Sequence, residues 1–170
     1  ESAGVIHHMD DPFIAWRILK DCLKSGGLMK IALYSELARQ HIVEMRKEIS
    51  RAGLGSNNLE MTSFRNMLFK SDKNQHKSIL NSNDLYSMST LKDLLFHVQE
   101  HRFTITQIQK YLSDLDLKFC GFEADTIVSD FKLTNPEKED LYNLKKWKAY
   151  EEKNPKPFAS MYQFWCQKLN

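Results

Sequence analysis

Apolar residues near the start of the chain change from a strand-like pattern to a helical one and back. The short apolar run Ala3 to Ile6 predicts a strand, and Asp11-Pro12 supplies a capping carboxylate and a proline suited to the first helical position. A helix is expected from there to Gly26-Gly27, which offers the positive φ that a helix exit needs. The near-continuous apolar run Leu28 to Tyr34 predicts a second strand. Residues 1–34 are therefore expected to form a βαβ unit with a right-handed crossover.

The pattern is helical from Ser35 to about Phe103. Two short helices are expected over Leu59 to Phe69 and Thr90 to Val98, the second capped by Ser89, and the polar segment Lys70 to Asp84 between them is interpreted as a loop. A longer amphipathic helix precedes them and ends at a glycine; its apolar residues at helical spacing are Ala38, Ile42, Met45, Ile49 and Ala52. Residues 35–103 thus read as a helical insertion.

Helix and strand alternate again over residues 104–170. Thr104 and Gln107 form a predicted capping box at the start of a helix. A strand over Lys118 to Ala124, a short helix around Leu141 to Glu152 and a final aromatic-rich strand over Met161 to Cys166 are expected to follow. The buried stripe of the first helix is predicted to be Ile105, Ile108, Leu112 and Leu115.

Composition narrows the class of protein without naming a partner. The chain has 170 residues, 42% hydrophobic and 27% charged, which is typical of one globular domain. Its formal net charge of +2 is too small to indicate binding to nucleic acid or to an anionic membrane. The three cysteines are far apart and not in Cys-x-x-Cys pairs, so a reducing, cytoplasmic setting is expected.

Three motifs occur together in the first part of the chain: Gly4-Val5-Ile6-His7-His8 at a strand end, Asp11-Pro12 at a helix start, and Leu23-Lys24-Ser25-Gly26-Gly27 before the strand that reaches Tyr34. This combination resembles class I S-adenosylmethionine-dependent methyltransferases, in which the segments are the fourth strand, its helix and the fifth strand. The resemblance implies an α/β fold that is the C-terminal half of a Rossmann-like methyltransferase. About four strands are expected, the last one antiparallel, with a helical insertion.

A narrower resemblance rests on three other segments: Leu33 to Arg39, Phe96 to Phe103, and Met161 to Trp165. They are similar to the methyltransferase domains of bacterial tetratricopeptide-repeat methyltransferases. The family's turn has proline where this chain has Ser25, a tolerable change because proline acts mainly on the entropy of the unfolded turn.

Two parts of the family's cofactor site are absent from this sequence. No Gly-x-Gly loop precedes the first strand, and no acidic residue ends a second strand. The family's residues that bind the methionine moiety and the ribose are therefore missing. Because the chain also opens with Glu1, it is expected to be a fragment whose partner is the missing N-terminal half of the same protein. Alone it is expected to bind S-adenosylmethionine weakly or not at all, and the methyl acceptor stays open.

The resemblance places the candidate site at the carboxyl ends of the first two strands. It implies a cofactor wall formed by Gly4, Val5, Ile6 and His7. An acceptor pocket is expected from Tyr34, Glu36, His97, Glu100, His101 and Arg102. His7, His8 and Glu36 are candidates for a general base, although the histidines can equally occupy a polar loop and Glu36 can equally favour a helix N-terminus.

Two other functions compete with methyl transfer. His97 to His101 fits the His-x-x-Glu-His pattern of a zinc hydrolase, but five-residue matches arise often by chance, and no metal is predicted. A non-catalytic binding or assembly module with a half-Rossmann fold is the second, supported by the missing cofactor loop. Trp16, Trp147 and Trp165 are assigned to packing, and Lys138 to Lys153 to a solvated helix face.

The first strand is also the predicted weak edge of the sheet. In the family it lies in the middle, beside a strand that this chain lacks. An apolar edge without lysine or proline is a template for another strand, so a homodimer through Ala3 to His7 is expected.

Overall fold

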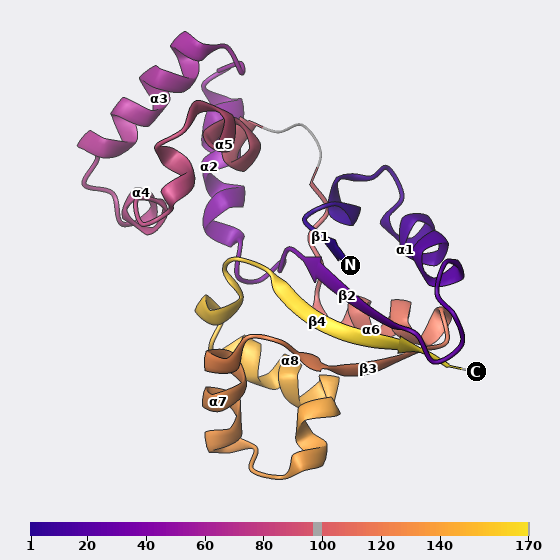
Figure 1. Ribbon diagram of the computed structural model, residues 1–170. Helices are drawn as coiled ribbons and strands as arrows, with labels where there is room; N and C mark the ends of the chain where they lie inside the picture. The colour runs from indigo at the N-terminus through magenta and orange to yellow at the C-terminus, as the bar shows by residue number, and fades with distance from the viewer. Residues whose placement is uncertain (97–99, 170) are drawn as a thin grey trace. The chain divides into compact units, whose positions relative to one another are not determined.

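The protein is described by a computed structural model that covers residues 1–96 and 100–169 (Figure 1). Its contacts divide the chain into two compact units, one of residues Glu1–Ala38 and Gln99–Asn170 and one of residues Arg39–Val98. We call them the sheet unit and the helical unit. Each has its own hydrophobic core, and the two cores share no residue.

The sheet unit is built on a four-stranded mixed sheet in the order β1-β2-β4-β3. β1 (Ser2–Ala3) pairs in parallel with β2 (Leu28–Leu33), and β4 (Tyr162–Lys168) runs antiparallel to both β2 and β3 (Leu117–Phe122). The last strand of the chain therefore lies inside the sheet and joins the parallel pair to β3.

Alternation along β4 separates the two faces of this sheet. Tyr162, Phe164 and Cys166 are fully buried, whereas Gln163 and Trp165 point to the opposite face and are exposed. Trp165 is 37% exposed, so its assignment to the core is wrong; the assignments of Trp16 and Trp147, both 0% exposed, are confirmed.

Three helices pack on the buried face of the sheet: α1 (Pro12–Asp21), α6 (Ile105–Asp114) and α8 (Leu144–Lys153). Trp16 of α1 contacts both Tyr111 of α6 and Phe164 of β4, and Trp147 of α8 contacts Phe122 of β3. The predicted starts of α1 and α6 are confirmed, because Asp11 accepts hydrogen bonds from the first turn of α1 and the Thr104–Gln107 capping box is complete.

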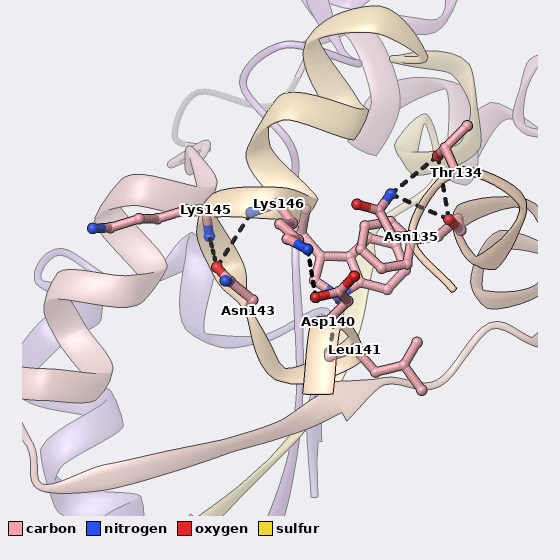
Figure 2. Close-up of polar contacts among 9 residues, drawn as sticks. Thr134, Asn135, Asp140, Leu141, Asn143, Lys145 and Lys146 are labelled. Carbon is pink, nitrogen blue, oxygen red and sulfur yellow. Dashed lines mark hydrogen bonds and ion pairs between the residues drawn. The ribbon is translucent and has the colours of Figure 1, made fainter. Parts of the chain in front are cut away.

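The chain between β3 and α8 forms α7 (Asp125–Thr134) and a short 3-10 helix, η4 (Lys138–Tyr142). Figure 2 shows how this connection ends: Asn143 accepts hydrogen bonds from the backbone N–H groups of Lys145 and Lys146, and Lys146 pairs with Asp140. The Trp147 indole N–H donates to the carbonyl of Leu141 at 2.9 Å, and the Trp147 ring stacks on Phe131 of α7. These contacts fix where α8 begins and how it is turned toward the sheet.

The helical unit contains α2 (Gln40–Arg51), α3 (Asn58–Lys70), α4 (Asn74–Ile79) and α5 (Met88–Leu91), with a 3-10 turn η2 (Asn83–Leu85) and a π-helical turn η3 (Lys92–Phe96). Its core is mainly aliphatic and methionine side chains. Those fully or nearly fully buried are Ile42, Met45, Ile49, Met61, Phe64, Leu68, Ile79, Leu85, Leu91, Leu94 and Leu95.

The structure corrects several expectations. The first strand ends at Ala3, because Gly4 adopts a positive φ of 73° and the chain turns into the 3-10 helix η1 (Ile6–His8). The expected loop Lys70 to Asp84 contains α4, whose Ile79 is buried. The helix expected from Thr90 begins earlier, after Ser87 instead of Ser89, and continues as a π-helical turn to Phe96; residues 97–99 lie outside the described part. α7 was not expected at all.

Two further observations concern the described residues as a whole. Cys22, Cys120 and Cys166 are all free thiols. None of the described helices combines the length and apolar character that crossing a membrane requires.

Candidate functional site

The candidate site lies where β1 and β2, the two parallel strands, reach their carboxyl ends. After β1, Gly4 has a backbone conformation that side chains rarely adopt, and an added Cβ would lie 3.7 Å from Met161 Cε. The chain then winds into η1, with the His8 N–H donating to the carbonyl of Val5. This turn buries Ile6 and His7 and leaves Val5 53% exposed. An apolar side chain thus faces solvent beside a glycine turn.

Aromatic rings gather behind this turn. The ring of His7, 0% exposed, lies 4.0 Å from the ring of Tyr34 and 4.3 Å from that of His8, measured between centroids. His8 is only partly buried. Of the two histidines in the sequence motif, His8 therefore keeps part of its side chain accessible to solvent, and His7 is part of the packing behind it.

A segment far along the chain closes the other side of the site. The N–H of His101 donates to the carbonyl of His7, and the N–H of Phe103 donates to the carbonyl of Tyr34, both at 2.8 Å. The N–H of Glu36 donates to the carbonyl of Phe103, also at 2.8 Å, and Ser35 and Phe103 form a parallel bridge. Residues 101–103 thus run beside the end of β2 and are joined to it by an isolated parallel bridge at Phe103.

Charged groups converge on Arg102 at this rim. Its Nε lies 2.9 Å from Glu36 Oε2, and its Nη1 lies 3.7 Å from Glu100 Oε1. The Glu100 side chain is 1% exposed, whereas those of Glu36 and Arg102 are 40% and 22% exposed. The guanidinium therefore holds a buried carboxylate on one side and a reachable one on the other.

A buried carboxylate that the sequence reading assigned to a solvated face lies directly behind this rim. Glu151 of α8 is 4% exposed, and its Oε1 accepts hydrogen bonds from Ser35 Oγ at 2.6 Å and from Tyr162 OH at 2.5 Å. Burial raises the pKa of the Glu151 carboxyl, and the two hydroxyl donors oppose that rise in part. The sequence does contain a signal that Glu151 is buried. Glu151 follows Leu144 and Trp147 at helical spacing and so lies on the buried face of α8.

The structure therefore places nearly all the residues expected at the site close together, at the carboxyl ends of the two parallel strands. Gly4 to His8 form the turn after β1, Tyr34 and Glu36 follow β2, and Glu100, His101 and Arg102 lie beside them. His97 lies outside the described residues. Within the described part of the chain, no group of three or more His, Cys, Asp or Glu side chains is arranged to hold a metal ion.

Comparison with known proteins finds a similar sequence and a similar solved structure. No protein-family model matches the sequence. It is 24% identical, over 162 residues, to the uncharacterized protein syc1184_c from Synechococcus sp. (strain ATCC 27144 / PCC 6301 / SAUG 1402/1). Its structure is similar to that of PKMT2 from Rickettsia typhi, with a TM-score of 0.62 and 10% sequence identity over 97% of this chain.

The match to the Synechococcus protein includes 86% of this chain but only 38% of the Synechococcus protein. The match to PKMT2 includes 34% of PKMT2. The second match bears on the fold alone, because sequence identity is so low. PKMT2 is a methyltransferase. The protein thus has an α/β fold, with a four-stranded mixed sheet and helices, that is similar to the fold of a methyltransferase.

Proposed function

We propose that this chain forms the acceptor side and part of the cofactor wall of a class I S-adenosylmethionine-dependent methyltransferase. The observation that carries the proposal is the convergence of the turn after β1 with the ends of β2 and of the segment 101–103. In open α/β sheets, ligands bind at the carboxyl ends of parallel strands. The sheet order, with an antiparallel last strand inside the sheet, agrees with the C-terminal half of that fold.

The residues after β1 fit the cofactor side. Gly4 brings the backbone close to the strand end without a side chain, and the exposed Val5 offers an apolar wall beside it. The buried Ile6 and His7 support this wall from within. S-adenosylmethionine would supply an electrophilic methyl group there, and the role of these four residues is to shape the space in which an acceptor approaches in line.

The residues after β2 fit the acceptor side. Glu36 is held by Arg102 yet remains reachable, so it can orient an acceptor hydroxyl or amine. His8 is the reachable imidazole and is our preferred candidate for a weak general base, whereas His7 is buried by its neighbours. Tyr34 and His101 complete the pocket wall, and the buried Glu100 supports Arg102 from within.

The test is methyl transfer by the product of the complete open reading frame. We expect incorporation of radiolabelled methyl groups from S-adenosylmethionine into an acceptor in an extract of the source cells, and a fall of about a hundredfold for His8→Ala or Glu36→Ala. Asp10→Ala, an exposed neighbour on the same loop, serves as the control. Absence of incorporation, or equal activity of all three variants, would contradict the proposal.

A further inference from the structure

The buried carboxylate of Glu151 connects three parts of the sheet unit that are far apart in sequence. Its Oε1 accepts hydrogen bonds from Ser35, which follows β2, and from Tyr162, the first residue of β4. Of the described residues, these two hydroxyls are the hydrogen-bond donors to Glu151, and neither carries a charge. A buried carboxylate without a cation is costly in free energy, so its presence calls for a role beyond filling space.

Ser35 passes this connection to the turn that carries Glu36. While Ser35 Oγ donates to Glu151, it accepts the N–H of Ala38 at 2.9 Å. Between these two residues, the N–H of Glu36 is held by the carbonyl of Phe103. Hydrogen bonds therefore hold the backbone around Glu36 at two places, the Glu36 N–H and the Ser35 side chain. The second of these depends on Glu151, which accepts the hydrogen bond from Ser35.

The helix that supplies Glu151 is itself firmly placed. Asn143 caps its first turn, as Figure 2 shows. Trp147 is stacked on Phe131 and donates a hydrogen bond to the carbonyl of Leu141. Tyr150, one residue before Glu151, is also buried and donates to Asp130 of α7. Glu151 thus projects from a rigid support toward the turn that carries Glu36.

We propose that Glu151 is a positioning residue for the acceptor side of the site: through Ser35 it holds the Ser35–Ala38 turn so that the Glu36 carboxylate stays on Arg102. The inference rests on the proposed function, because only there is Glu36 an acceptor-pocket residue. Removing the link to Ser35 leaves Glu36 mobile and its ion pair broken for part of the time. The link to Tyr162 ties the same carboxylate to the sheet.

The experiment follows single protons by NMR on this 170-residue chain and does not depend on methyl transfer. Two reporters are used: the exchange rate of the Ala38 amide with solvent, and the Arg102 Nε–H signal, which is slow to exchange while Glu36 accepts it. In Glu151→Ala we expect Ala38 to exchange about tenfold faster or more, and the Arg102 signal to be lost. Amides of β2 and β4, such as Ile31 and Phe164, should keep their protection.

Four further variants make the test specific. Glu151→Gln keeps an acceptor oxygen for Ser35 and should restore both reporters. Ser35→Ala removes the link at its other end and should reproduce Glu151→Ala, which provides the test if the latter fails to fold. Tyr162→Phe removes only the bond to the sheet and should leave Ala38 protected. Glu152→Gln changes the exposed neighbour of Glu151 and should change neither reporter.

The outcomes separate this inference from the proposed function. If Glu151→Ala or Ser35→Ala leaves the Arg102 signal intact, or if all sheet amides lose protection equally, Glu151 is not a positioning residue, whatever the enzyme assay shows. If the reporters respond as expected but the complete protein transfers no methyl group, the link from Glu151 to Glu36 stands and the proposed function fails.

Discussion

The sheet unit and the helical unit each hydrogen-bond a carboxyl group to fully buried side chains, but only the one in the sheet unit, Glu151, is itself buried; the side chain of its counterpart, Glu48, is 32% exposed. In the helical unit, Glu48 Oε2 lies 2.8 Å from Nε2 of the fully buried His76, and Glu48 Oε1 lies 3.5 Å from Lys73 Nζ. The hydrogen bond to His76 lowers the pKa of Glu48. In the sheet unit, Glu151 has only hydroxyl donors, and burial raises its pKa.

The difference is the one expected if the proposed site lies in the sheet unit. A carboxylate paired with histidine and lysine across two helices is an ordinary way to stabilise a small helical core. A carboxyl kept without a cation, behind a rim that carries another acid and an arginine, is typical of a site where geometry matters more than stability.

The largest expected effect tests whether each unit depends on its own core. Trp147→Ala should destabilise the sheet unit by about 3 to 5 kcal/mol, because the buried indole loses its stack on Phe131 and leaves a cavity. Urea unfolding followed by NMR should show sheet amides lost first, with His76 signals persisting. Trp165→Ala, on the exposed face, is the control and should cost less than about 1 kcal/mol. Simultaneous loss of both units' signals would argue against separate cores.

The next effect concerns the helical unit. His76→Ala should destabilise it by roughly 1 to 3 kcal/mol, because Glu48 loses its buried partner. The contribution of Glu48 in the wild type is present above its ordinary pKa of 4.5 and is lost as pH falls through its lower folded pKa. Stability measured in urea at a series of pH values should therefore fall on acidification in the wild type and less so in His76→Ala. Parallel pH curves would contradict the pairing.

Glu151 should respond to pH in the opposite direction. A raised folded pKa means that folding favours the protonated acid, so the wild type loses stability as pH rises from 4.5 through the folded pKa. Glu151→Gln cannot ionise and should become the more stable protein at neutral pH, by about 1 kcal/mol or more. Urea unfolding at pH 4 and pH 7 checks this prediction. A stability difference independent of pH would show that Glu151 is ionised equally in the folded and unfolded states.

The smallest effect tests a local feature that the sequence identified by itself. Thr104→Ala should cost about 1 kcal/mol, because it removes the capping hydrogen bond to the Gln107 N–H at the start of α6. Thr126→Ala, exposed within α7, is the matched control and should change stability by no more than a few tenths of that amount. Equal effects would mean that the capping box adds little in this protein.

The sequence predicted the sheet unit better than the helical unit, for physical reasons. Asp11-Pro12, the Thr104 capping box and the apolar runs of β2 and β4 are local signals, and the structure confirms the elements they mark. α4 was missed because its residues are polar apart from the buried Ile79 at its end, so tertiary packing decides its conformation. The strand at Ala3 was drawn too long because the positive φ of Gly4 leaves no trace in hydrophobicity.

The candidate site also has parts that the sequence predicted and parts that it did not. The turn from Gly4 to His8 and the end of β2 were found through the resemblance. Their contact with residues 101–103 depends on backbone hydrogen bonds that no local pattern encodes. Glu151 was missed because the charges around it suggested a solvated helix face, although its spacing from Trp147 places it on the apolar face. The homodimer through the first strand stays a prediction, and the edge strand on which it depends covers only Ser2–Ala3.

Calorimetric titration with S-adenosylmethionine tests the central claim most directly, using two glycines of similar conformation. Gly4 has a φ of 73° at the proposed cofactor wall, and Gly26 has a φ of 71° in the turn before β2, with open space around it. Alanine at either position carries a similar backbone strain of about 1–2 kcal/mol. We predict that the product of the complete open reading frame binds the cofactor, that Gly4→Ala weakens binding about tenfold or more, and that Gly26→Ala leaves it unchanged. No binding by the wild type, or equal affinities of the two variants, would contradict the account.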